Sequence, residues 1–328
     1  MTRRRDLDED DVRVRPGKGS RPRTRTRPEH ADAVDGMVTA VDRGRYTCLI
    51  DGRPVVAVRA RELGRSGRVV VGDRVGVEGE LDGGRDSLAR IVRVDPRTSV
   101  LRRSADDTDP VERVLVANAD QLVIVTAVAN PEPRPRLIDR CIVAAFDAGL
   151  LPLLCLTKTD LASPAALLET YAPLKVGYLT WTKGADVADV HARLTGHTSV
   201  LVGHSGVGKS TLVNALVPDA MRSTGVVNAV TGRGRHTSSS AVALPLADGG
   251  WVVDTPGVRS FGLAHVSPQS LLVAFPDLLE LVEACPPGCD HTGTDPHCAL
   301  DGGAADPERL VSYRRLLGAR GNRDSELE

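Results

Sequence analysis

One octapeptide constrains the fold of this chain more than any other feature. Residues Gly203–Ser210 match the pattern G-x-x-x-x-G-K-[ST] at every fixed position, between an apolar run at Ser199–Val202 and a helical pattern at Thr211–Leu216. The glycines let backbone N–H groups surround phosphate oxygens, and the helix N-terminus adds its positive dipole end. The pattern predicts a phosphate-binding loop between a strand and a helix of an α/β domain.

The loop and the residue after it supply the expected phosphate contacts. Lys209 would reach the terminal phosphates as a catalytic cation, and the Ser210 hydroxyl would bind Mg²⁺. The residues expected to line the phosphates are Gly203, His204, Ser205, Gly206, Val207, Gly208, Lys209, Ser210 and Thr211.

A second nucleotide motif lies upstream of this loop. Leu151–Leu156 is typical of a short buried parallel strand, and it ends in Thr157, Lys158, Thr159 and Asp160. The tetrapeptide resembles the N-K-x-D motif with which GTPases recognise guanine, with Thr in place of Asn. A carboxylate at Asp160 can accept both the ring N–H and the exocyclic amine of guanine, which adenine lacks. Alone, such a Lys-Asp pair is also typical of a solvated turn.

A third motif follows the phosphate loop. The apolar run Trp251–Val253 ends in Asp254, Thr255, Pro256 and Gly257, which match D-x-x-G. Asp254 would hold Mg²⁺ through water, and the Gly257 N–H would face the terminal phosphate. The alternative is an ordinary turn, which D-T-P-G also suits.

The polar, basic segment Gly232–Ser240 suits a loop that a terminal phosphate and Mg²⁺ would order, although a Ser-rich surface loop is the alternative. Thr237 or Ser238 would contact the nucleotide here, with Thr237 the expected Mg²⁺ ligand. Val258 occupies the position where many GTPases have a Gln that orients water. The catalytic water is therefore expected to depend on His236, on a partner, or on both.

The order of these motifs is reversed relative to common GTPases, in which the phosphate loop comes first and the base-recognition motif last. Here the base-recognition motif leads. This order predicts a circular permutation, in which the doubly wound sheet is retained and the chain ends have moved.

The N-terminal part predicts a small β-barrel. Short alternating runs occur at Met37–Ala40, Tyr46–Ile50, Val55–Val58, Arg68–Val71, Val75–Glu78 and Leu88–Val94. About five strands in this length suggest an OB-fold, a barrel that commonly binds nucleic acid. This part also holds a set of arginines: Arg53, Arg59, Arg61, Arg65 and Arg68. Contact with RNA and a solvated strand face are equally good explanations of this set.

The C-terminal part contains Cys285, Cys289, His291 and Cys298. Three thiolates and an imidazole complete a closed tetrahedral zinc shell, and the close spacing is typical of a zinc knuckle. Unligated thiols are the alternative, and His297 competes for the imidazole position. A helical pattern follows at 307–317.

Bulk properties exclude some classes of protein. Lys and Arg number 42 and Asp and Glu 43 among 328 residues, so net charge indicates no partner. Residues 13–28 hold seven basic residues and no acidic one, which predicts a disordered arm that contacts nucleic acid or solubilises the chain. No apolar run is long enough to span a membrane and no export signal is present, so a cytoplasmic protein is expected.

Together these motifs resemble the ribosome small-subunit-dependent GTPase A family (RsgA, also YjeQ), over about 36–317. The segment 116–121 also matches the start of that family's GTPase domain. The resemblance implies a multidomain protein: a basic tail at 1–35, an OB-fold at 36–98, a circularly permuted α/β P-loop GTPase domain at 99–264 and a zinc-binding helical domain at 265–328. Ser238 stands where the family has Thr, and the Cys/His spacing is shifted by one residue on each side of His291.

The same resemblance implies a function. It implies hydrolysis of GTP to GDP and phosphate, stimulated by the 30S subunit in its late maturation, with contacts to 16S rRNA. It also implies a monomer that binds GTP or GDP, Mg²⁺ and one structural Zn²⁺, with His236 as the catalytic histidine. Two other classes fit the phosphate loop: a P-loop ATPase or kinase, against which Asp160 argues, and a non-hydrolysing RNA-binding switch, against which Lys209, Ser210 and Asp254 argue.

Overall fold

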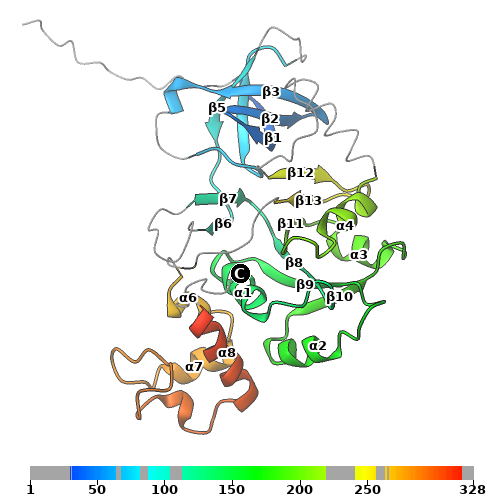
Figure 1. Ribbon diagram of the computed structural model, residues 1–328. Helices are drawn as coiled ribbons and strands as arrows, with labels where there is room; N and C mark the ends of the chain where they lie inside the picture. Colours follow the sequence, from blue (N-terminus) through cyan, green and yellow to red (C-terminus); the bar gives the residue numbers. More distant parts are fainter. Residues whose placement is uncertain are drawn as a thin grey trace, which may run out of the picture.

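The computed structural model describes residues 30, 32–63, 68–81, 88–103, 113–218, 241–255, 263 and 266–319. Three parts follow one another along the chain and in space (Figure 1). A barrel of strands, blue and cyan, lies at one end. A central α/β part, mostly green, lies in the middle, and helices coloured orange and red lie at the other end.

The N-terminal part is a five-stranded barrel, which confirms the predicted OB-fold. Its strands follow the order β1-β2-β3-β5-β4, and an additional pairing of β1 with β4 closes the barrel. Strands β3 and β5 are parallel and the other neighbours are antiparallel. The strands are β1 (Val34–Asp42), β2 (Arg45–Ile50), β3 (Arg53–Arg59), β4 (Arg74–Glu78) and β5 (Ala89–Val94).

The expectation of a strand at Arg68–Val71 is wrong. The run forms no barrel strand: Val71 makes a single parallel bridge with Val116, and the Ala117 N–H donates to the Val71 carbonyl at 3.0 Å. Gly72 turns the chain directly afterwards with φ of 89°, and a Cβ there would lie 2.0 Å from the Ala117 carbonyl oxygen. This apolar run therefore joins the barrel to the central part.

The central sheet is doubly wound, with strand order β10-β9-β8-β11-β13-β12. All its neighbours are parallel except β12 and β13. Strand β12 also pairs with β1 of the barrel at Ala40 and Val242, so barrel and sheet are continuous. The strands are β8 (Gln121–Ala127), β9 (Leu151–Thr157), β10 (Gly177–Trp181), β11 (Thr198–Val202), β12 (Val242–Pro245) and β13 (Trp251–Asp254).

Helices cover both faces of this sheet because neighbouring side chains of each strand point in opposite directions. On β8, Leu122 and Ile124 belong to the core under α1, whereas Val123 and Val125 belong to the core under α3 and α4. The helices are α1 (Pro135–Asp147), α2 (Ala165–Tyr171), η3 (Ala172–Leu174), α3 (Ala188–Leu194) and α4 (Lys209–Leu216). A separate ribbon pairs β6 (Val100–Arg103) with β7 (Arg113–Ala117).

The C-terminal helices pack on α1 through aromatic side chains. The centroid of the Phe275 ring lies 5.4 Å from that of Tyr313 and 6.2 Å from that of Phe146 in α1, and both pairs pack edge to face. The elements are α6 (Pro268–Leu272), α7 (Pro276–Val282), η4 (Ala299–Asp301) and α8 (Pro307–Ala319). Within the described ranges, every helix is too short or too polar to cross a membrane.

Candidate functional site

The phosphate loop connects β11 to α4 and passes close to its neighbours. A Cβ on Gly203 would lie 2.4 Å from the Val125 carbonyl oxygen, so a side chain there would force the loop away from β8. Gly206 and Gly208 have φ of 84° and 94°, in the left-handed region that glycine adopts without strain. Helix α4 begins at Lys209, which places its free N–H groups at the loop.

The acid of the third motif lies beside the lysine of the loop. Strands β11 and β13 are parallel neighbours, and Asp254, the last residue of β13, pairs with Leu201 near the end of β11. The Lys209 ammonium forms an ion pair with the Asp254 carboxylate. The buried Thr255 hydroxyl donates to the Leu201 carbonyl at 2.7 Å and fixes the chain beyond Asp254. The lysine predicted to bind phosphate and the carboxylate predicted to bind Mg²⁺ therefore meet at one edge of the sheet.

The base-recognition motif lies against the same loop. Its first residue, Thr157, is buried at 1 % exposed, and its hydroxyl donates to the Val207 carbonyl at 2.5 Å. The Thr126 carbonyl lies farther from that hydroxyl, at 3.3 Å. One short side chain thus ties the end of β9 directly to the phosphate loop, although the two segments are 50 residues apart.

The rest of the motif turns outward from the sheet. Lys158 has φ of 59° and its ammonium donates to the Asn130 carbonyl. The Thr159 hydroxyl lies 2.9 Å from the Thr182 hydroxyl, after β10. Asp160 is exposed, so its carboxylate is accessible to a base.

Asn130 and Thr182 contact the base-recognition motif, but neither belongs to any of the three motifs. Asn130 follows β8 and supports Lys158, while Thr182 follows β10 and supports Thr159. Both lie past the carboxyl ends of parallel strands, where ligands bind in doubly wound sheets. Position at the carboxyl end of a parallel strand is the sequence signal that could find such residues.

Several predicted site residues lie outside the described part of the chain. These are His236, Thr237 and Ser238 of the segment before β12, and Gly257 of the third motif. Their roles stay predictions.

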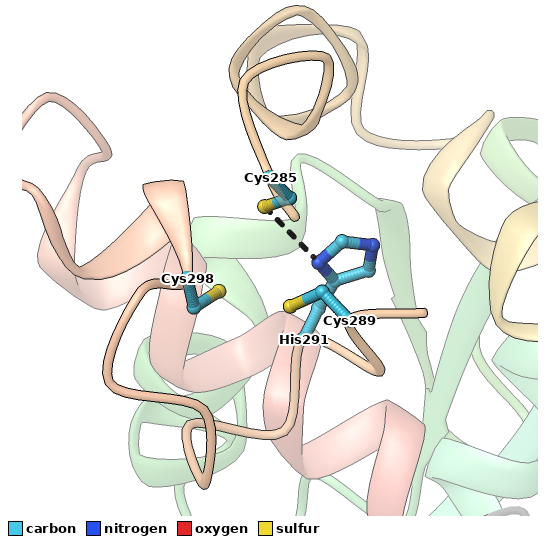
Figure 2. A group of neighbouring side chains, drawn as sticks. All are labelled: Cys285, Cys289, His291 and Cys298. Carbon is cyan, nitrogen blue, oxygen red and sulfur yellow. Dashed lines mark hydrogen bonds between the residues drawn. The ribbon is translucent and has the colours of Figure 1, made fainter. Parts of the chain in front are cut away.

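The C-terminal cluster is compact. Cys285, Cys289, His291 and Cys298 place one ligand atom each within 4.8 Å of all the others (Figure 2). The Cys285 sulfur lies 3.5 Å from His291 Nδ1 and accepts the Ala299 N–H at 3.3 Å. The donor set fits Zn²⁺, whose structural sites form closed tetrahedra from combinations such as three thiolates and one imidazole.

The loop geometry decides which histidine joins the cluster. His291 is buried, with φ of 59°, and its ring points among the sulfurs. His297 is exposed, and its backbone N–H donates to the Asp295 carboxylate at 2.9 Å. The rival imidazole therefore lies outside the four-residue cluster.

The thiols affect one another's protonation. The His291 backbone N–H lowers the pKa of the Cys289 thiol, but desolvation and the neighbouring Cys298 and Cys285 thiols raise it to about 11. Without a cation the Cys289 thiol therefore retains its proton at neutral pH. A bound metal would displace it, because the ligand is the thiolate.

Comparison with known proteins decides the family. The sequence model described as RsgA GTPase matches residues 94–264. A small ribosomal subunit biogenesis GTPase RsgA of Azotobacter vinelandii is 38% identical over 266 residues, which cover 76% of this chain and 75% of the relative. The chain belongs to the RsgA GTPase family. The RsgA of Pseudomonas aeruginosa strain LESB58 is similarly close, 39% identical over 72% of both chains.

Solved structures show the same fold as this RsgA family member. YjeQ from Thermotoga maritima aligns with a TM-score of 0.65 and 24% identity, covering 88% of this chain and 99% of that one. YloQ, described as a circularly permuted GTPase, aligns with a TM-score of 0.62 and 23% identity, covering 89% and 96%. The predicted permutation is confirmed.

Proposed function

We propose that this RsgA family member hydrolyses GTP to GDP and phosphate, and that the small ribosomal subunit stimulates the reaction during late 30S maturation. One observation carries the proposal. Thr157, Val207, Lys209 and Asp254, from all three motifs, are joined by a hydrogen bond and an ion pair at one edge of the sheet. The names of the relatives supply the small-subunit step.

Different residues of the site would bind the phosphates, the base and the metal ion of the GTP complex. The N–H groups at the start of α4 and Lys209 would hold the phosphates, and Asp160 would accept the two guanine donors. Mg²⁺, held by Ser210, Thr237 and a water on Asp254, would neutralise charge on the terminal phosphates. His236 would position the attacking water, because Val258 has no polar group for that task.

The barrel is the proposed contact with 16S rRNA. Arg53 and Arg61 of the barrel and Arg68 of the run that leaves it are exposed, and they are suited to bind phosphates without reading bases. We further propose that the protein acts as a monomer in the cytoplasm, where small subunits mature, and that the cysteine cluster holds one structural zinc ion.

Phosphate release tests this proposal. GTP turnover is measured with isolated small subunits, with large subunits and with neither, with Lys209→Ala as the inactive control. We expect GTP turnover to rise with small subunits but not with large subunits, and Lys209→Ala to abolish this rise. Equal turnover in all three mixtures would contradict ribosome dependence. ATP turnover equal to GTP turnover would contradict the role of Asp160.

A further inference from the structure

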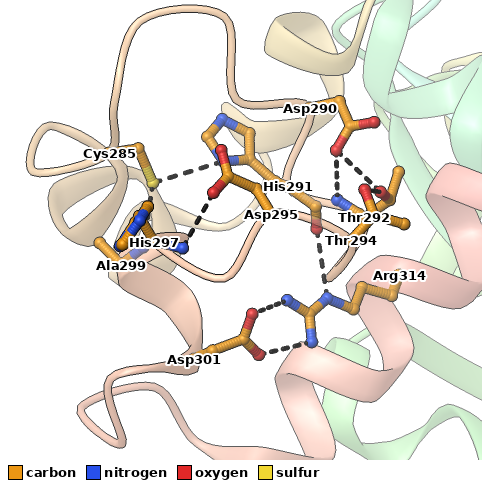
Figure 3. A network of polar contacts seen from close by, with 10 residues as sticks. All are labelled: Cys285, Asp290, His291, Thr292, Thr294, Asp295, His297, Ala299, Asp301 and Arg314. Carbon is orange, nitrogen blue, oxygen red and sulfur yellow. Dashed lines mark hydrogen bonds and ion pairs between the residues drawn. The ribbon is translucent and has the colours of Figure 1, made fainter.

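Arg314 of α8 contacts two separate turns of the cysteine cluster (Figure 3). Its Nε donates to the His291 carbonyl at 3.2 Å. Its two terminal nitrogens donate to the two carboxylate oxygens of Asp301 at 2.8 Å each. All three nitrogens of the guanidinium are therefore engaged within the zinc-binding part.

Each contact fixes a turn that supplies a ligand. The first turn contains His291, whose backbone is left-handed, and Gly293, where a Cβ would lie 3.0 Å from the guanidinium carbon. The planar guanidinium thus packs directly beneath this turn.

The second turn begins at Cys298 and ends at Asp301, whose carboxylate accepts both hydrogen bonds from the guanidinium. The Asp301 N–H donates to the Cys298 carbonyl at 3.0 Å, and the Ala299 N–H donates to the Cys285 sulfur at 3.3 Å. Movement of Asp301 would therefore move the segment that positions two sulfurs.

We propose that Arg314 is a positioning residue of the zinc site, which holds the His291 and Cys298 turns at the separation that a tetrahedral ion requires. The inference rests on the proposed zinc site and extends it to a residue that is not a ligand. The ligands come from a loop in which the only regular element is the 3-10 turn η4. Hydrogen bonds within single turns, such as Thr292 with Asp290, shape each turn locally, whereas Arg314 contacts both ligand turns at once. Groups that orient ligands typically contribute about 10–100-fold to metal affinity.

The shape of the Arg314 side chain contributes in addition to its charge, which also acts on the neighbouring Cys298 thiol. The Arg314 and Asp301 side chains are 24% and 41% exposed, so water screens their attraction. A planar fork holds a carboxylate and a carbonyl at once, which a single ammonium does not reproduce. Lysine at this position should therefore fail to replace arginine fully.

The next residue of α8 provides a matched control. Arg315 points away from the cluster, towards α1 and α2, where it pairs with Asp139 at 3.2 Å and stacks on the Tyr171 ring. Its substitution perturbs the same helix without touching either ligand turn.

The experiment measures zinc affinity of the full chain by competition with a chromogenic chelator, and the absorption spectrum of the Co²⁺-loaded protein. Arg314→Gln should bind zinc about 10–100-fold more weakly and alter the Co²⁺ spectrum. Arg314→Lys should fall between it and the unmodified protein, and Arg315→Gln should stay within about twofold of the unmodified protein with an unchanged spectrum. Asp301→Asn weakens the fork from the other side and should also lower the affinity.

The outcomes separate this inference from the zinc assignment. If the unmodified protein binds zinc and Arg314→Gln matches it in affinity and spectrum, the positioning role is wrong and the zinc site stands. If the unmodified protein binds no zinc, both are wrong. Should Arg314→Gln fail to fold, Asp301→Asn decides: unchanged affinity there overturns the inference, and weaker binding with an altered spectrum supports it.

Discussion

At the scale of single residues, the departure of this chain from N-K-x-D has a physical explanation. Thr157 is buried and points at the phosphate loop, with its hydroxyl 2.5 Å from the Val207 carbonyl. A hydroxyl supplies the one donor that this carbonyl needs. Contact with the base would fall to Asp160, which is exposed at the end of the motif. Loop support and base recognition are thus separated along the tetrapeptide.

Thr157→Ala tests this separation. Loss of the hydroxyl leaves the buried Val207 carbonyl without its side-chain donor, at a cost of about 1–3 kcal/mol to the loop conformation. GDP and GTP should both bind more weakly, by about 5–100-fold, while the preference for guanine over adenine nucleotides is retained. Competition with a fluorescent GDP analogue measures both quantities, and Thr157→Ser is the control that keeps the hydroxyl. A changed base preference with unchanged GDP affinity would place Thr157 on the base instead.

At the scale of helices and strands, α8 is joined to α1 by a buried acid. Asp139 of α1 is 3 % exposed and pairs with Arg315, while Arg140 donates to the Ala319 carbonyl at 2.9 Å. Burial raises the pKa of the Asp139 carboxyl, and Arg315 and Tyr171 partly oppose the rise. The folded state therefore binds this proton more tightly than the unfolded state does. The group's contribution to stability falls as the pH rises from 3.8 through the raised folded pKa.

Arg315→Gln should increase this dependence on pH. Without the guanidinium the pKa of Asp139 rises further, so the variant loses about 1.5–3 kcal/mol of unfolding free energy near pH 7. The loss should shrink as the pH falls below the raised folded pKa of Asp139, where the carboxyl is protonated in both folded proteins. Urea denaturation at several pH values measures the difference, with Arg315→Lys as the variant that keeps the charge. A loss independent of pH would show that Asp139 is not the group affected.

Helices and strands could be predicted from the sequence where the pattern of apolar residues or a motif is strong. Helix α4 spans 209–216, and its end matches the helical pattern at 211–216 that follows the phosphate loop, although it begins two residues earlier. Helices α6 and α7, of five and seven residues, were missed because helices this short depend on packing. Strand β6 has only four residues and was missed too. The contact of Thr157 with Val207 joins segments far apart in sequence, so motif spacing alone could not reveal it.

At the scale of the whole molecule, the permuted chain order places the nucleotide edge between two further parts. The barrel joins the sheet through β1 and β12, and β12 is followed by β13, which ends at Asp254. At the other end, α1 contacts α8, and the loop before α1 supports Lys158 through Asn130. A single nucleotide would therefore span motifs that are separated and reordered along the chain.

A crystal structure of the complex with GDP and Mg²⁺ tests this claim most directly. We predict the phosphates within the loop 203–210 and the Asp160 carboxylate about 3 Å from the guanine ring N–H and exocyclic amine, the range of a charge-assisted hydrogen bond. Guanine on another surface, with Asp160 in solvent, would contradict the account.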